Sequence, residues 1–244
     1  MKKVIGIVSE GPTDYVVLKA VIDRITGEEN RYLPLQPEPN LIGQYGNGWK
    51  GVWRWCRETP SINLLLEGVQ PKIDAIVIQM DGDVVRKEKE VHCLCESTEC
   101  EKKGAEFPLY CKKAAASCPV EIPCKSHSEG TENFIKHGIE TLSKELKDWD
   151  KDHVIITIPC DSTDTWVIAA YEDIADTETI IDPWKTIIAR GKNYQGIRVH
   201  GDKKNVVTYS VFAEKVAENW ELVVNQCQAA SLLDKEIKRS LIQL

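Results

Sequence analysis

Three short apolar runs divide the chain, and amphipathic stretches separate them. The runs lie at residues 4–8, 73–80 and 153–158. They are short and rich in Val and Ile, which predicts strands that are buried on both faces. Apolar residues with helical spacing lie at 13–25, at about 130–148 and at about 161–171. This alternation predicts an α/β fold in which helices flank a largely parallel sheet.

The remaining segments have other patterns. Residues 30–48 are rich in Pro, Gly and Asn and are predicted to form a loop. A helical stretch from about 49 to 66 is broken near Pro60, and Thr13 is a candidate N-cap for the first helix. Residues 176–204 are predicted to mix loop and short helix. The tail, 205–244, is predicted to be a helical C-terminal extension.

Composition narrows the class of protein. The chain has 244 residues, 42% of them hydrophobic and 28% charged, which is typical of a folded globular chain and fits a single domain over 1–244. Its apolar runs are too short for a membrane span or a signal peptide, so we expect a cytoplasmic protein without membrane contact. The net charge of −7 argues against broad, charge-driven binding of nucleic acid, but not against a site that meets phosphate through a bound metal.

Acidic residues follow all three predicted strands. Glu10 follows the first, Asp81 and Asp83 follow the second, and Asp161 and Asp164 follow the third. In parallel sheets, functional residues gather at the carboxyl ends of the strands. Carboxylates that meet there repel one another, and a divalent cation such as Mg²⁺, which prefers oxygen ligands, relieves the repulsion. The alternative is structural, because isolated acids after strands often cap helices or close turns.

Two of these motifs together resemble the Toprim domain of topoisomerases, primases and OLD-family nucleases. Residues 9–14 read Ser-Glu-Gly-Pro-Thr-Asp after the first strand, and residues 80–83 read Met-Asp-Gly-Asp after a later one. The family hallmark is a Glu-Gly-x-x-Asp/Glu turn followed by Asp-x-Asp. Residues 159–169 also resemble the acidic, Trp-containing helix of small stand-alone Toprim-like proteins. The resemblance covers residues 1–83 and 130–235 and implies a Toprim-like Rossmannoid fold.

The resemblance also implies roles for single residues. Glu10 is expected to be a metal ligand or general acid/base, and Asp81 and Asp83 to bind Mg²⁺ or Mn²⁺. Asp14 is expected to support the turn or a second metal.

OLD-like nucleases complete this site with further acids and a lysine. In this chain Asp161 or Asp164, and Lys203 or Lys204, are the candidates. The implied activity is hydrolysis of phosphodiester bonds in DNA or RNA, tRNA included, in prokaryotic defence against phage. OLD-like nucleases usually work with an ATPase, fused or separate, and this chain has no Gly-x-x-x-x-Gly-Lys-Ser/Thr motif. The resemblance therefore implies a separately encoded ATPase as a candidate partner, with independent action as the alternative.

Residues 84–128 depart from the pattern of the rest of the chain and are predicted to be an insertion. They hold many lysines and six of the nine cysteines, namely Cys93, Cys95, Cys100, Cys111, Cys118 and Cys124. In a cytosolic protein such a cluster favours Zn²⁺, whose thiolate ligands would make a closed structural site and supply folding energy. Disulfides and inert free thiols are the alternatives, because the Cys-x-x-Cys pairs of common zinc fingers are absent.

The sequence thus leads to a first hypothesis, a Mg²⁺-dependent nuclease, and to an alternative from another class. The alternative is a non-catalytic subunit that binds nucleic acid or a protein partner through a structural zinc insertion. A phosphotransferase or phosphatase ranks last, because the first turn lacks a Gly-rich phosphate loop. The oligomeric state, monomer or homo-oligomer, is left open.

Overall fold

The computed structural model describes residues 2–37, 46–85, 131–201 and 203–242. The sheet contains four parallel strands in the order β2-β1-β3-β4. They are β1 (Val4–Val8), β2 (Arg31–Gln36), β3 (Ala75–Gln79) and β4 (Val154–Thr157). β1 and β3 are buried along their whole length, as continuous Val/Ile runs in a covered parallel sheet should be. The α/β class with helices flanking a parallel sheet is therefore confirmed.

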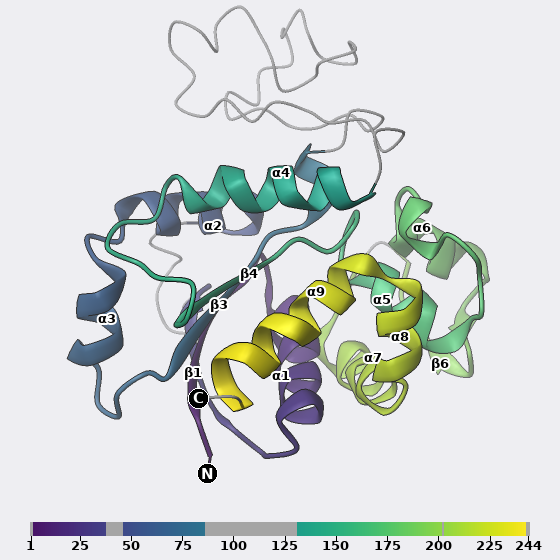
Figure 1. Ribbon diagram of the computed structural model, residues 1–244. Coiled ribbons are helices and arrows are strands. Elements are labelled where there is room, and N and C mark those ends of the chain that lie inside the picture. Colours follow the sequence, from purple (N-terminus) through teal and green to yellow (C-terminus); the bar gives the residue numbers. More distant parts are fainter. Residues whose placement is uncertain (1, 38–45, 86–130, 202, 243–244) are drawn as a thin grey trace, which may run out of the picture.

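Helices cover both faces of this sheet (Figure 1). α1 (Pro12–Thr26) links β1 to β2, whereas α2 (Gly48–Glu58) and α3 (Ile62–Gly68) lie between β2 and β3 in the chain, and α4 (Thr131–Ser143) precedes β4. The step from β1 to β2 runs in the opposite direction to the steps from β2 to β3 and from β3 to β4. Since parallel crossovers are right-handed, α1 lies on one face and α2 to α4 on the other.

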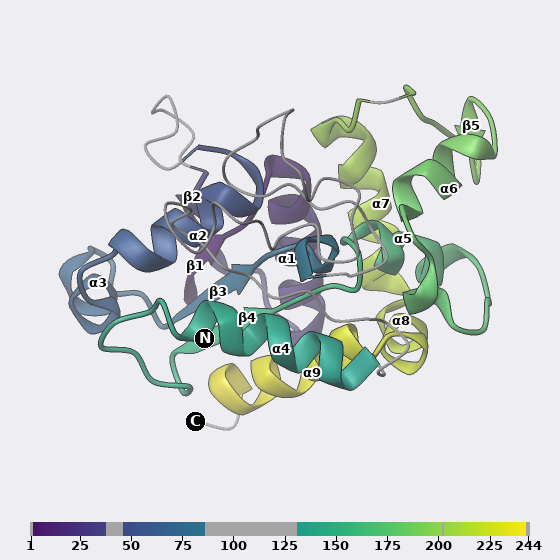
Figure 2. The ribbon, with the colours of Figure 1, turned by 90° about the horizontal axis from the view of Figure 1, so that it is seen from above.

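The C-terminal half packs beside α1. α5 (Asp164–Tyr171) is buried along nearly all of its length, because α7 (Val206–Glu218), α8 (Trp220–Gln226) and α6 (Pro183–Ala189) pack around it. The short elements η3 (Thr177–Thr179), β5 (Asn193–Tyr194) and β6 (Ile197–Arg198) lie between α5 and α7 in the chain. α9 (Gln228–Ile237) and the π-helical turn η4 (Lys238–Ile242) return to α1, and α9 also contacts β4 (Figure 2).

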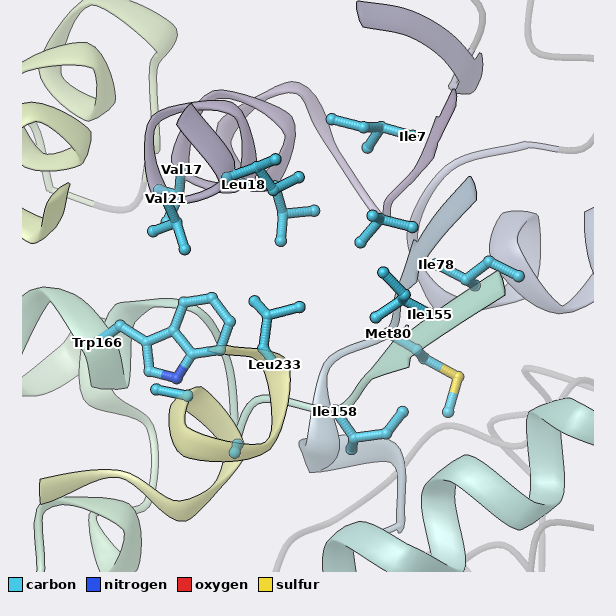
Figure 3. Packing of buried hydrophobic residues seen from close by; sticks show 14 of the residues in the cluster. Ile7, Val17, Leu18, Val21, Ile78, Met80, Ile155, Ile158, Trp166 and Leu233 are labelled. Carbon is cyan, nitrogen blue, oxygen red and sulfur yellow. The ribbon is translucent and has the colours of Figure 1, made fainter. Parts of the chain in front are cut away.

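One hydrophobic cluster joins the sheet to the C-terminal helices. Figure 3 shows Leu18 of α1, Ile155 of β4 and Leu233 of α9 around the same interior, with Trp166 of α5 beside them. Trp166 stacks edge-to-face on Trp220 at 5.7 Å between ring centroids. The helical tail predicted after residue 205 is thus part of the core that supports the sheet. None of the helices in the described ranges is long and apolar enough to cross a bilayer.

The structure corrects several local predictions. Residues 31–36 form the edge strand β2, so the prediction of loop over 30–48 is wrong there: backbone pairing with β1 overrides the low strand propensity of a segment containing Pro34. Residues 193–198 hold the small antiparallel β5–β6 pair, which the prediction of loop and short helix over 176–204 missed.

Thr13 lies inside α1, and Gly11 is the N-cap of that helix. Helix α4 ends at Ser143 rather than near residue 148. The six cysteines of the predicted insertion lie outside the described residues.

Gly82 allows two loops to meet at the carboxyl end of the sheet. The amide of Gly82 donates to the carbonyl of Pro159 at 2.9 Å, and the amide of Asp83 donates to the carbonyl of Asp161 at 3.0 Å. A Cβ atom on Gly82 would lie 2.5 Å from the Pro159 oxygen and 2.9 Å from the Phe134 ring. Close approach of the Pro159 backbone is therefore the reason for glycine at this position.

We predict that Gly82→Ala destabilises the protein by about 1–3 kcal/mol, the usual result of overpacking against groups that cannot move away. Urea unfolding measures the change. Gly68→Ala is the matched control, because a Cβ there meets nothing within 4 Å, and its effect should stay within about 0.5 kcal/mol. Equal stability of the two variants would contradict the packing role of Gly82.

Candidate functional site

The sheet has its topological switch point between β1 and β3. The two strands are hydrogen-bonded neighbours, but the chain leaves β1 toward one face of the sheet and leaves β3 toward the other. In open α/β sheets, ligands bind in the crevice that this divergence leaves at the carboxyl ends of the strands. Glu10 comes two residues after β1, and Asp81 comes two residues after β3. The topology therefore puts the acidic motifs where a ligand site is expected.

Direct hydrogen bonds join these two motifs. The backbone amide of Asp81 donates to Oε1 of Glu10 at 2.7 Å. The buried side chain of Gln79 completes the connection: its amide nitrogen donates to Oδ1 of Asp81 at 2.7 Å, and its oxygen accepts from the amide of Glu10 at 3.3 Å. The expectation that residues 10 and 81 meet at one edge of the sheet is confirmed. Both acidic side chains remain partly exposed, so a ligand can reach them.

Asp14 brings a third carboxylate from the first turn of α1. Its Oδ1 accepts from the hydroxyl of Thr163 at 2.6 Å, which ties α1 to the loop before α5. Burial raises the pKa of Asp14, and the charge of Asp164 raises it further, while the Thr163 bond and Lys204 act in the opposite direction.

The carboxylates of the site repel one another. Burial raises the pKa of Glu10 well above its usual range, and the charges of Asp83 and Asp14 raise it further. Burial also raises the pKa of Asp81 well above its usual range, with further contributions from Glu10, Asp14 and Asp83. Glu10, Asp14, Asp81 and Asp83 thus form one acidic cluster in which each charge disfavours the others.

Lys204 places a positive charge against this cluster. Its Nζ lies 2.5 Å from Oδ2 of Asp164, which is fully buried, and 31% of the Lys204 side chain is exposed. Burial by itself lowers the pKa of Lys204, but the carboxylates of Asp164, Asp81 and Asp14 outweigh burial and hold it above its ordinary value. Lys204 therefore remains charged at neutral pH and can bind an anionic ligand.

Asp164 fixes the position of Lys204. Besides the ammonium group, Oδ2 of Asp164 accepts from the hydroxyl of Ser162 at 2.8 Å, and Oδ1 accepts from the hydroxyl of Tyr209. Its carboxylate thus accepts from three donors, which is why it can be buried completely. The arrangement assigns Asp164 to positioning, in contrast to the more open Glu10 and Asp81.

Asp161 has a different environment. Its Oδ2 accepts from the backbone amide of Asp182 at 2.9 Å, and its carbonyl accepts from Asp83. It adopts a left-handed conformation, with φ of 65°, in the turn between β4 and α5. Asp161 thus holds the loops around the cluster together. Of the two lysine candidates, Lys204 pairs with Asp164, and its pKa is raised by Asp81 and Asp14 of the cluster, whereas Lys203 makes no ion pair within the described residues.

Sequence reasoning missed Gln79, Thr163 and Tyr209. Gln79 ends a strand that is otherwise apolar, and Tyr209 is fully buried on the inner face of α7. A polar residue in an apolar run was the available signal, but each of these residues also has a partner from a distant segment, as Gln79 has in the amide of Glu10. Thr163 is 149 positions from Asp14, and Tyr209 is 45 positions from Asp164.

The residues of the cluster suit Mg²⁺ by their chemistry. They offer carboxylate oxygens, and burial together with neighbouring carboxylates raises the pKa values of Glu10 and Asp81, so a bound cation would favour their charged forms. Within the described ranges, no three His, Cys, Asp or Glu side chains form a ready-made cage for a metal ion. Mg²⁺ does not require one, because one or two carboxylates with water and substrate phosphate commonly hold it.

Comparisons with family models, with curated proteins and with solved structures found no match to this chain. The geometry and chemistry of the acidic cluster are therefore the basis for a functional proposal.

We predict that Asp81→Asn stabilises the metal-free protein at pH 8. The folded pKa of Asp81 is raised, so ionisation destabilises the folded state as the pH rises above the ordinary carboxyl pKa, and an amide removes this penalty while its oxygen still accepts from Gln79. The midpoint of thermal unfolding in EDTA should rise by about 2 °C or more, which corresponds to about 1 kcal/mol for a chain of this size. The gain should shrink as the pH falls toward 4. A lower midpoint than wild type at pH 8 would refute the repulsion.

We predict that Asp164→Ala lowers the free energy of unfolding by about 3 kcal/mol, because it leaves buried Tyr209 and Ser162 hydroxyls and the Lys204 ammonium without their acceptor. Chemical denaturation measures the loss. Lys185→Ala is the control, since it breaks the exposed Lys185–Asp182 pair and should change stability by about 0.5 kcal/mol or less. A loss for Asp164→Ala as small as that of the control would contradict its anchoring role.

Proposed function

We propose that the protein is a Mg²⁺-dependent nuclease of Toprim-like type that hydrolyses phosphodiester bonds of DNA or RNA. The single observation that carries the proposal is the contact between the Glu10 side chain and the Asp81 backbone at the switch point of the sheet. It joins the two motifs on which the Toprim resemblance depends. The parallel sheet and the surrounding acidic cluster support the same reading.

Each group of the cluster has a role in this proposal. One or two carboxylates among Glu10, Asp81 and Asp83 would hold the metal, together with water and substrate phosphate, and Asp14 would lie behind them. Gln79 orients Asp81 through its 2.7 Å hydrogen bond. Lys204, held by Asp164, binds a phosphate oxygen of the substrate and offsets the negative charge that develops there. The bound Mg²⁺ would polarise the phosphate, activate water and stabilise the leaving oxygen.

The wider proposals follow from the resemblance. They are a role in prokaryotic anti-phage defence, a separately encoded ATPase as partner, a cytoplasmic location, and zinc in the cysteine-rich insertion. No described residue bears on the zinc site, because the six cysteines lie outside the described ranges.

Cleavage assays with plasmid, single-stranded DNA and tRNA, in Mg²⁺ or Mn²⁺, test the nuclease proposal. Glu10→Gln should reduce cleavage about 100-fold or more, because a metal ligand is lost. The variant keeps an oxygen that can accept from the Asp81 amide, so the loop should hold its shape. Asp148→Asn is the control: it also removes one carboxylate charge, but Asp148 is exposed and lies before β4, at the opposite end of the sheet.

The outcomes separate the two hypotheses. Full activity of a folded Glu10→Gln variant would reject the assignment of Glu10. If the wild-type protein cleaves none of the three substrates with either metal, the non-catalytic binding subunit becomes the better reading.

A further inference from the structure

Positive charge is concentrated in one segment of this acidic protein. Residues 183–204 contain six Lys or Arg residues and one acidic residue, Asp202, whereas the whole chain has a net charge of −7. The segment comprises α6, the β5–β6 pair and the turn that leads to α7. Such an asymmetry creates a local positive potential that the overall charge does not reveal.

Three of these six cations are already paired. Lys185 contacts Asp182 at 3.0 Å, Arg190 contacts Glu172 at 2.7 Å, and Lys204 contacts Asp164. The other three, which are Lys192, Arg198 and Lys203, are exposed and make no ion pair with any residue in the described ranges. Their charge is therefore available to a partner.

The backbone of the β5–β6 pair gathers these three cations. The amide of Val199 donates to the carbonyl of Lys192 at 3.0 Å, and the amide of Lys203 donates to the carbonyl of His200 at 3.0 Å. Arg198 and His200 are both exposed on either side of buried Val199, so they share the outer side of the strand. We call the surface of Lys192, Arg198, His200 and Lys203 the basic hairpin.

The basic hairpin is anchored to the body of the protein. Tyr194 is fully buried, and its hydroxyl donates to Glu172 at 2.9 Å. The Tyr194 ring also packs edge-to-face on Phe212 of α7, at 6.0 Å between centroids. The cations are therefore presented from a fixed position, beside α6 and α7 at one corner of the molecule (Figure 2).

This surface leads directly to the acidic cluster. Lys203 of the basic hairpin adjoins Lys204 of the cluster in the chain. Trp184 of α6 lies on the same border, with its ring centroid 5.9 Å from the Lys204 ammonium and 5.9 Å from the Tyr209 ring. A polyanion held on the hairpin would thus have its next charged group near Lys204.

We propose that the basic hairpin binds the sugar-phosphate backbone of a nucleic acid and guides it to the acidic cluster. This inference rests on the proposed nuclease function, because it supplies the substrate-binding surface of that site. Without such a surface, a chain of charge −7 would repel its substrate. Lys and Arg side chains that contact phosphates hold the chain in position without reading its sequence.

The test measures binding without metal, so that cleavage plays no part. The variant replaces Lys192, Arg198 and Lys203 with Gln. The matched control replaces Lys147, Lys151 and Lys235 with Gln, which changes the net charge equally; all three are exposed, and Lys147 and Lys151 lie near the amino end of β4. Fluorescence anisotropy with labelled single- and double-stranded DNA and RNA of about 30 nucleotides, in EDTA and at about 50–200 mM salt, gives the affinities and their salt dependence.

The wild-type protein and the control should bind at least one of these probes with similar affinity. The hairpin variant should bind it about 10-fold or more weakly, and its slope of log K against log salt should be smaller by about 2–3, since up to three phosphate contacts are lost. Thermal unfolding should be unchanged, because the three side chains make no ion pair within the described residues.

Three results would overturn the inference: no binding of any probe by the wild-type protein, equal affinity of the hairpin variant and wild type, or equal weakening by both triple variants. Failure of the nuclease proposal has a different signature. In that case nucleic acid still binds and the hairpin variant still weakens it, but no substrate is cleaved with Mg²⁺ or Mn²⁺.

Discussion

Parallel pairing of β1 with β3 is the constraint on which the site depends. The register Val8 to Ile78 places the carboxyl ends of both strands side by side. The chain then turns to opposite faces, and the residues that follow each strand, Glu10 and Asp81, remain together in the gap. Any other neighbour for β1 on this side would separate the two motifs and leave two unrelated acidic turns.

Electrostatic repulsion in the cluster is balanced by structure from the C-terminal half. Burial and neighbouring charges raise the pKa values of Glu10 and Asp81, which by itself opposes folding. Lys204 supplies positive charge, and Asp164 and Tyr209 hold it there. The helices after residue 205 therefore do more than cover the sheet: Tyr209 on α7 contributes to the cluster, and Phe212 beside it supports the basic hairpin. Sites of this kind trade stability for function.

Positive and negative charge lie on two adjoining surfaces, the basic hairpin and the acidic cluster. The acidic cluster suits a divalent cation, whereas the basic hairpin suits the phosphates of a polymer. The two adjoin at Lys204, which is part of the basic segment in the chain and pairs with Asp164 beside the cluster. Under the proposed nuclease function, this arrangement would allow a protein with a net charge of −7 to bind a nucleic acid.

The sequence by itself determined the elements with strong hydrophobic patterns. Continuous Val/Ile runs predicted β1, β3 and β4, and the acids after them marked the carboxyl end of the sheet where the acidic cluster lies, because these signals are local. Tertiary structure decided three further points. They are the formation of strand β2, the partners of Gln79 and Tyr209, and which of Lys203 and Lys204 lies beside the cluster. In each of these cases the deciding contact joins segments far apart in the chain, as Thr163 and Asp14 do across 149 positions, and no local pattern records which distant segment packs against which.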